Sequence, residues 1–160
     1  MATIIDSLGF LKGFPVQFVL PAGDTLWKTV RIELILDFPT IIAARAAAGA
    51  AALTAADVIE AIPVPAGYLV SNVGMEVMTV GAAGTIALGD GTAAAGYLAA
   101  NAVTALGYFG GVPVLVAGAF APTLSGGKLY TVNDTIDLTL ATAVPSAAKV
   151  RVFCLMTDLT

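Results

Sequence analysis

Residues 62–101 read IPVPAGYLVSNVGMEVMTVGAAGTIALGDGTAAAGYLAAN and contain short apolar segments separated by turns, with few charges. Within 68–80, Val73, Met75 and Val77 recur at every second position, which places them on one face of a strand. A further strand is expected at 85–88, and the Gly-Asp-Gly sequence that follows it at 89–91 is typical of a tight turn. The stretch therefore predicts packed β-structure rather than an active site.

The flanking segments continue this two-residue periodicity. At 26–36 apolar residues alternate with polar ones, and Arg31 and Glu33 share a face, where they are expected to form a solvated or interface pair. Residues 135–140 and 149–156 alternate in the same way, and Cys154 falls on the apolar face of the last segment, which favours a buried thiol over a reactive one. About eight short strands separated by turns predict an all-β fold, an antiparallel β-sandwich of jelly-roll-like type.

The first part of the chain has a different character. Residues 1–25 are interrupted by glycine and proline too often for a long helix, so we expect an extended N-terminal arm at 1–25 and a β-sandwich domain at 26–160. Aromatic anchors tend to dominate protein interfaces. The predicted protein-interaction residues are therefore the aromatic residues of the arm and of its junction with the sandwich, namely Phe10, Phe14, Phe18 and Trp27. Packing of the arm on its own domain and docking on a neighbour both remain open.

Residues 41–60 are ambiguous. Their alanines favour a helix, whereas the Ile-Ile and Val-Ile pairs at the two ends suit strands. One interpretation is a short alanine helix between two strands, and the other is two strands that flank a loop of small residues. The dense β-pattern elsewhere in the chain favours the second interpretation.

The composition limits the kind of partner. Of the 160 residues, 58% are hydrophobic and only 11% are charged, against roughly 25% charged in typical soluble domains. This leaves little charge to cover the surface of a monomer, which favours a protein that works in an assembly. The formal net charge of −4 and the scattered basic residues argue against nucleic acid as a partner. No run of about 20 apolar residues predicts a membrane span, and no secretory signal precedes the first strand, so a soluble protein made in a cytosol is expected.

The residues that carry most enzyme chemistry are missing or scattered. The chain has no histidine, which removes the commonest general base, and a single cysteine, which excludes a cysteine metal cage. The close carboxylate pairs, Asp57 with Glu60 and Asp134 with Asp137, are expected to serve turns and solvation. We therefore predict no enzyme activity, with no catalytic residues, no metal ligands and no cofactors.

Two apparent binding motifs do not predict a binding site. Residues 89–94 match the dinucleotide pattern G-x-G-x-x-A, but no long helical pattern follows and no carboxylate lies between Asp90 and Asp134 to bind the ribose. Trp27, Tyr68, Tyr97 and Tyr108 could stack on sugars, but scattered aromatic residues are more often part of a core or an interface.

The order of motifs supports one family resemblance. A proline-glycine turn at 62–67, a valine-rich strand at 70–80, a Leu-Gly-Asp-Gly turn at 88–91 and Tyr97-Leu98 are followed by KLYTVNDTIDLTL at 128–140. Over about residues 53–158 this order resembles a tailed-bacteriophage capsid decoration, or cement, protein of the β-sandwich kind. The first 50 residues depart from that pattern.

The resemblance implies a virion structural protein. It implies a jelly-roll-like fold, self-association as a homodimer or homotrimer, and binding across the outside of the major capsid lattice, which would stabilise the head. The protein would then lie on the capsid surface after assembly in the bacterial host cytoplasm, with no nucleic acid or membrane partner. The alternative is a receptor- or glycan-binding module of a phage tail or head fibre.

Overall fold

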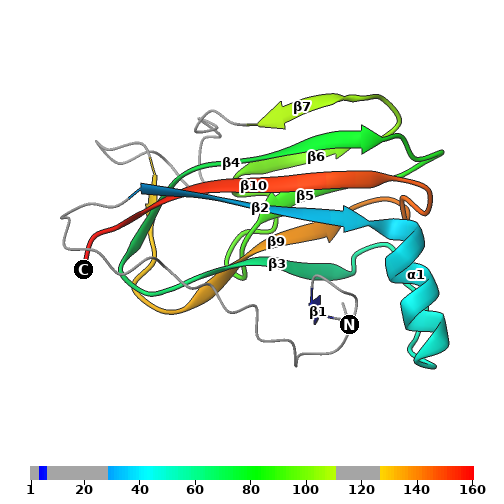
Figure 1. Ribbon diagram of the computed structural model, residues 1–160, viewed down its shortest axis with the longest axis horizontal. Coiled ribbons are helices and arrows are strands. Elements are labelled where there is room, and N and C mark those ends of the chain that lie inside the picture. Colours follow the sequence, from blue (N-terminus) through cyan, green and yellow to red (C-terminus); the bar gives the residue numbers. More distant parts are fainter. Residues whose placement is uncertain (1–3, 7–28, 111–126) are drawn as a thin grey trace.

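A computed structural model describes residues 4–6, 29–110 and 127–160, the first of these ranges through its backbone only. The described residues form two β-sheets packed face to face, with a helix at one end of the sandwich (Figure 1). In chain order the elements are β1 (Ile4–Asp6), β2 (Thr29–Asp37), α1 (Phe38–Ala47), β3 (Val58–Val64), β4 (Tyr68–Thr79), β5 (Thr85–Gly89), β6 (Leu98–Ala102), β7 (Gly107–Gly110), β8 (Lys128–Leu129), β9 (Asp134–Leu140) and β10 (Lys149–Asp158).

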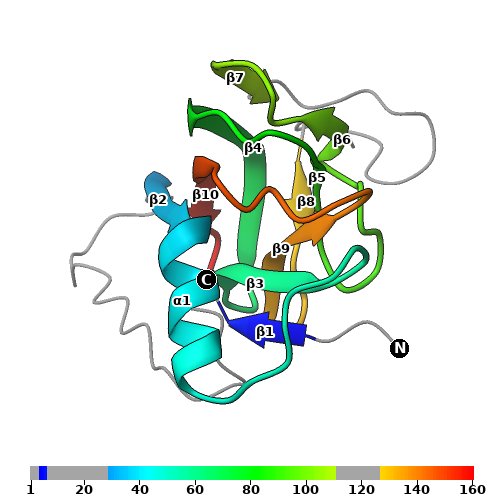
Figure 2. The same cartoon turned by 90° about the vertical axis from the view of Figure 1, so that its right-hand side faces the viewer.

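The strand order is that of a jelly roll. Sheet A has the order β1-β3-β9-β5-β6, and sheet B has the order β2-β10-β4-β7, with β8 also paired to β4 (Figure 2). From β2 to β10 the chain crosses between the sheets at each step, apart from the β5–β6 hairpin and the short β8. The pairings among these strands are antiparallel, and β1 adds to β3 in parallel. The predicted all-β, jelly-roll-like sandwich is confirmed.

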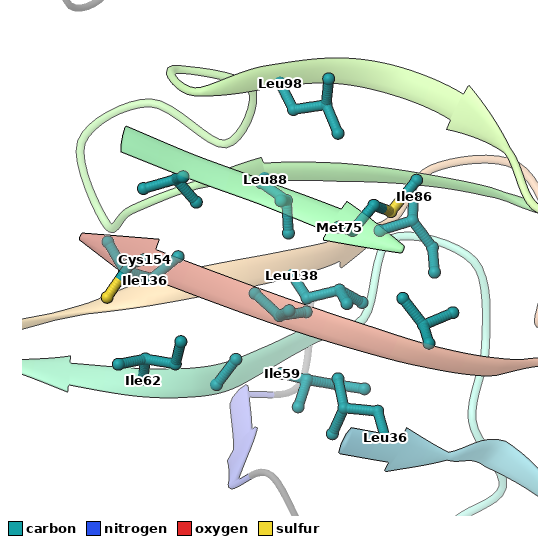
Figure 3. Close-up of a cluster of buried hydrophobic side chains, with 14 of the residues drawn as sticks. Leu36, Ile59, Ile62, Met75, Ile86, Leu88, Leu98, Ile136, Leu138 and Cys154 are labelled. Atoms are coloured by element: carbon teal, nitrogen blue, oxygen red, sulfur yellow. The ribbon is translucent and has the colours of Figure 1, made fainter. Parts of the chain in front are cut away.

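The core lies between the sheets and follows the predicted alternation (Figure 3). On β10, Val150, Val152 and Cys154 are completely buried, whereas the residues between them point to the outer face of sheet B. Met75 of β4 in sheet B and Leu138 of β9 in sheet A belong to the same core and are also completely buried. Burying such side chains contributes roughly 1.5–3 kcal/mol each, so this interlayer surface is the main source of stability.

The preferred interpretation of residues 41–60 was wrong, because a helix, α1, begins directly after β2. Asp37 has extended backbone geometry at the N-cap position and its carboxylate accepts a hydrogen bond from the Thr40 N–H at 3.3 Å. Pro39 lies in the first turn, where its missing N–H costs nothing. The buried side chains of Phe38 and Ile41 attach the helix to the end of the core. Packing therefore favours a helix here, as the helix propensity of the alanines does.

A short part of the predicted arm lies within the described residues. Ile4–Asp6 pairs with Val58–Glu60 of β3, so part of the segment 1–25 continues sheet A. The remainder of that segment lies outside the described residues, and the division of the chain at residue 25 stays a prediction.

Candidate interaction surface and buried polar clusters

The outer face of sheet B carries an ion-pair network that spans three strands. We call Arg31 and Glu33 of β2, Arg151 of β10 and Glu76 of β4 the sheet B ion-pair network. The Arg31 Nη2 to Glu33 Oε1 distance is 2.6 Å, Arg151 Nη1 lies 3.3 Å from Glu76 Oε2, and Arg151 Nε lies 3.8 Å from Glu33 Oε2. The predicted Arg31–Glu33 pair is therefore present. The register of β10 with β2 and β4 causes this arrangement, because Arg151 lies beside Glu76 and one outward position from Glu33.

An aromatic residue of the same face is sheltered by this network. Phe153 points outward from β10 yet is only 9% exposed. The Arg31 guanidinium lies 5.0 Å from the centre of its ring, and the Tyr108 ring of β7 packs at 6.0 Å between centroids. Gly74, which has no side chain, lies opposite Phe153 on β4. Guanidinium, phenyl and phenol groups from three strands thus form one contact.

Two apolar side chains of this face remain open to solvent. Ile35 is 48% exposed and Tyr108 is 60% exposed, and both lie in the row that Arg151 and Glu76 occupy. Half-exposed ion pairs contribute little to stability, about 0–1 kcal/mol each. The network instead places charged groups beside these exposed apolar side chains.

A second polar cluster fixes the turn after β5. The Asp90 side chain is completely buried, and its Oδ1 accepts hydrogen bonds from the N–H groups of Thr92 and Ala93 at 2.8 and 3.1 Å. Its Oδ2 pairs with the Lys128 ammonium and accepts a hydrogen bond from the Tyr130 hydroxyl at 2.9 Å. The Tyr97 and Tyr130 hydroxyl oxygens lie 2.9 Å apart. These contacts join the turn to β8, which is distant in sequence.

The environment of Asp90 favours its charged form. Burial alone would raise its pKa, but the contacts with Lys128, with the N–H of Thr92 and with the Tyr130 hydroxyl outweigh burial and lower the pKa below its ordinary value. A Cβ at Gly89 would lie 1.9 Å from the Ala93 carbonyl oxygen, so only glycine allows this turn. The G-x-G-x-x-A pattern is therefore a tight turn that leads into a strand, with its glycine and aspartate used structurally.

A second buried carboxylate has the opposite electrostatic environment. Asp137 lies in the middle of β9 and is 7% exposed, although a role in turns or solvation was predicted for it. Burial raises its pKa to about 6, the Thr135 hydroxyl that donates to it at 2.6 Å opposes this shift, and the charges of Asp134 and Glu60 increase it. For Asp57 the turn prediction is correct, since its carboxylate accepts a hydrogen bond from the Thr54 N–H at 2.8 Å.

Within the described ranges, no group of three or more histidine, cysteine, aspartate or glutamate side chains is arranged to hold a metal ion. Cys154 is fully buried as predicted, and burial raises its pKa to about 12, so the thiol is not ionised near neutral pH. In the same part of the chain, no helix is long and apolar enough to cross a membrane. Tyr68 and Tyr97 are buried at 5% and 9% exposure, while Tyr108 lies on the outer face of sheet B.

The predicted contact residues Phe10, Phe14, Phe18 and Trp27 all lie outside the described residues, so their role stays a prediction. Neither the sheet B network beyond its first pair nor the Asp90 cluster was predicted from the sequence. Arg151 could have been found from its outward position on β10, but the meeting of Asp90 with Lys128 depends on a separation of 38 residues.

Comparison with solved structures identifies the kind of fold. The structure matches a chain in the capsid of Ralstonia phage GP4 with a TM-score of 0.57 and 14% sequence identity, over 99% of both chains. Weaker matches are found in the capsid asymmetric unit of cyanophage Pam1, at a TM-score of 0.47 and 15% identity over 92% of this chain and 97% of the other, and in the capsid of Helicobacter pylori bacteriophage KHP30, at 0.44 and 12% over 85% and 90%. The first match shows a shared fold.

No protein-family model matches the sequence, and no curated protein matches it significantly. The strand order defines the protein as an all-β jelly-roll protein, and its fold is that of a chain in a phage capsid structure.

Proposed function

We propose that this protein is a structural component of a bacteriophage virion, and more specifically a capsid decoration, or cement, protein. It binds the outside of the major capsid lattice and stabilises the head. The observation that carries the proposal is the correspondence with a chain of the Ralstonia phage GP4 capsid, which extends over 99% of both chains. A match of this extent covers both sheets of the sandwich rather than one of them.

The surface chemistry supports a binding role. The outer face of sheet B offers exposed Ile35 and Tyr108 beside the charged side chains of the ion-pair network. Docking on a rigid partner costs free energy for each side chain that must be ordered, about 0.5–1.5 kcal/mol for a long flexible one. Side chains that already pair with one another within the face have less freedom to lose than solvated ones, and we place the capsid contact there.

The fibre-module alternative predicts aromatic residues and loop polar groups gathered at one exposed end of the sandwich. Tyr68 and Tyr97 are instead buried, and the Tyr97 hydroxyl is engaged with Tyr130. This distribution supports the decoration role over the fibre role.

The test is the number of copies of this protein in purified virions, measured by quantitative mass spectrometry against the major capsid protein. A decoration protein is expected at a copy number comparable to that of the major capsid protein. A few copies per particle would indicate a tail or fibre component, and absence from the particle would refute a virion role.

A second experiment tests the docking face. Heads that lack the protein are mixed with the purified wild-type chain or with the double variant Ile35→Asp and Tyr108→Asp, and bound protein is measured after sedimentation. The variant is expected to lose binding. Val132→Asp is the matched control, because Val132 is 67% exposed and precedes Asn133, which accepts a hydrogen bond from Ala66 before the start of β4. Tyr108 lies toward the other end of β4, opposite Glu76. Equal binding by both variants would refute docking through sheet B.

A further inference from the structure

Among the described residues, β2 is the longest of the strands that lie at the ends of the two sheets. The other terminal strands of the two sheets are short, since β1 has three residues, β6 has five and β7 has four. Short edges protect a sheet against pairing with another chain. In contrast, β2 has nine residues, and within the described part of the chain it pairs with β10 on one side only (Figure 2). Its inward side chains Val30, Ile32 and Leu34 remain partly exposed, unlike the fully buried inward residues of β10.

The sequence of β2 is complementary to itself in the antiparallel direction. A two-fold axis through Ile32 would place Arg31 opposite Glu33 of a second copy, and Glu33 opposite Arg31 of that copy. On the inward face the same register places Val30 opposite Leu34 and brings the two Ile32 residues together. Opposite charges on directly opposed positions stabilise antiparallel strands, and like charges there are destabilising.

Other positions of the axis along β2 that still place inward residues opposite inward residues are less favourable. An axis through Arg31 or through Glu33 brings like charges into direct opposition. An axis through Leu34 would place Arg31 opposite Asp37. The Asp37 carboxylate already caps α1, and its Oδ2 lies 3.6 Å from Lys149 Nζ. Because α1 begins at the next residue, that register would also bring the helix against the second copy.

From these observations we propose that two copies of this chain associate through β2, antiparallel and with the two-fold axis at Ile32. The two B sheets then form one continuous sheet, and the Arg31–Glu33 pair within each copy is exchanged for two pairs between copies. The proposal stands on strand length and charge order, and it does not depend on a role in the virion.

Charge reversal tests the pairing on the full-length chain. In sedimentation equilibrium the wild type is expected to be a dimer, and Glu33→Arg is expected to weaken the dimer roughly tenfold or more, because Arg31 then opposes the arginine introduced at position 33 of the other copy. The double variant Arg31→Glu with Glu33→Arg has complementary charges again and should recover most of the affinity. A monomeric wild type, or an oligomer that Glu33→Arg leaves unchanged, would overturn the proposal, and thermal melting checks that each variant is folded.

Cysteine cross-linking tests the position of the axis. Ile32→Cys is expected to form a disulfide between two copies on mild oxidation, since directly opposed residues have Cα atoms roughly 4.5–5.5 Å apart. Ile35→Cys is the control, because the proposed register separates the two copies of residue 35 by roughly 20 Å. The native Cys154 is fully buried and does not interfere. Cross-linking of the Ile35→Cys variant without cross-linking of the Ile32→Cys variant would exclude this register.

Discussion

Asp90 and Asp137 are both buried carboxyl groups, at 3% and 7% exposure, but their pKa values are shifted in opposite directions. Asp90 receives two backbone N–H groups, an ammonium and a phenol, and its pKa is lowered. Asp137 receives the Thr135 hydroxyl and lies near other carboxylates, and its pKa is raised to about 6. Burial alone therefore does not determine whether an acid in this sandwich is charged.

The local backbone explains the difference. Asp90 follows β5 in a turn, where the N–H groups of Thr92 and Ala93 are directed at its carboxylate. Asp137 lies within β9, which pairs with β3 on one side and β5 on the other, so neighbouring N–H groups belong to the sheet ladders. A carboxylate in a turn can obtain backbone donors that a carboxylate in a central strand cannot.

The largest expected effect comes from neutralising Asp90. Asp90→Asn keeps the shape of the side chain but removes the charge that pairs with Lys128. Removal of one partner from a buried ion pair typically costs 3–5 kcal/mol, and because Lys128 is partly exposed we expect a loss of about 3 kcal/mol in the free energy of unfolding, measured with urea.

The matched control breaks an exposed pair instead. Lys149→Met removes the pair with Asp37, in which both side chains are 39% exposed, and it should cost no more than about 1 kcal/mol. If Asp90→Asn costs no more than Lys149→Met, the Asp90 cluster does not stabilise the fold as described.

Neutralising Asp137 should raise the free energy of unfolding, whereas neutralising Asp90 lowers it. Its pKa in the folded state, about 6, lies above the ordinary value, so the stability linked to this group is complete below about pH 4 and is lost as the pH rises through 6. After allowance for solvent screening, Asp137→Asn should gain about 1–2 kcal/mol at pH 8. The unfolding free energy should also become less dependent on pH between 4 and 6.

Asp90 supplies the comparison in the same pH series. Its lowered pKa means that its stabilisation is present above about pH 4 and is lost as the pH falls further, so Asp90→Asn should remove that acid-side loss. An Asp137→Asn protein with an unchanged slope between pH 4 and 6 would show that another group produces the dependence.

The smallest effect is expected at Tyr130. Tyr130→Phe removes one of the donors to Asp90 together with the contact to Tyr97, which should cost about 1 kcal/mol. Combined with Asp90→Asn the two losses should not add, since both variants act on the same carboxylate. Additive losses in urea unfolding would indicate that Tyr130 stabilises the fold independently of Asp90.

The sandwich was predictable because its strands alternate in a way that local sequence reveals. The inward residues of β9 and β10 lie on the face that this alternation predicts, as do Val73, Met75 and Val77 of β4. At the beginning of β4 the alternation fails, because a register shift in the pairing with β10 brings Val70 to the inward face as well, while Thr79 at the other end is exposed. The helix α1 was missed although its signals were present, with Asp37 as N-cap and Pro39 in the first turn. The β-rich context outweighed those local signals in the interpretation.

The polar clusters could not be predicted in the same way. The meeting of Asp90 with Lys128 and Tyr130 joins residues 38 and 40 positions apart, through a strand order that alternation does not reveal. The burial of Asp137 likewise depends on the neighbouring strands β3 and β5, while its own sequence context suggests an exposed polar position.

The central place of β10 has a consequence for synthesis of the chain. It lies between β2 and β4, and Thr29 of β2 bonds to Thr157 of β10 across 128 positions. While the ribosome is still adding residues, β2 and β4 have been made but the strand that joins them has not. Sheet B can therefore be completed only after translation of β10, and a protein shortened before residue 149 would lack the strand that joins β2 to β4.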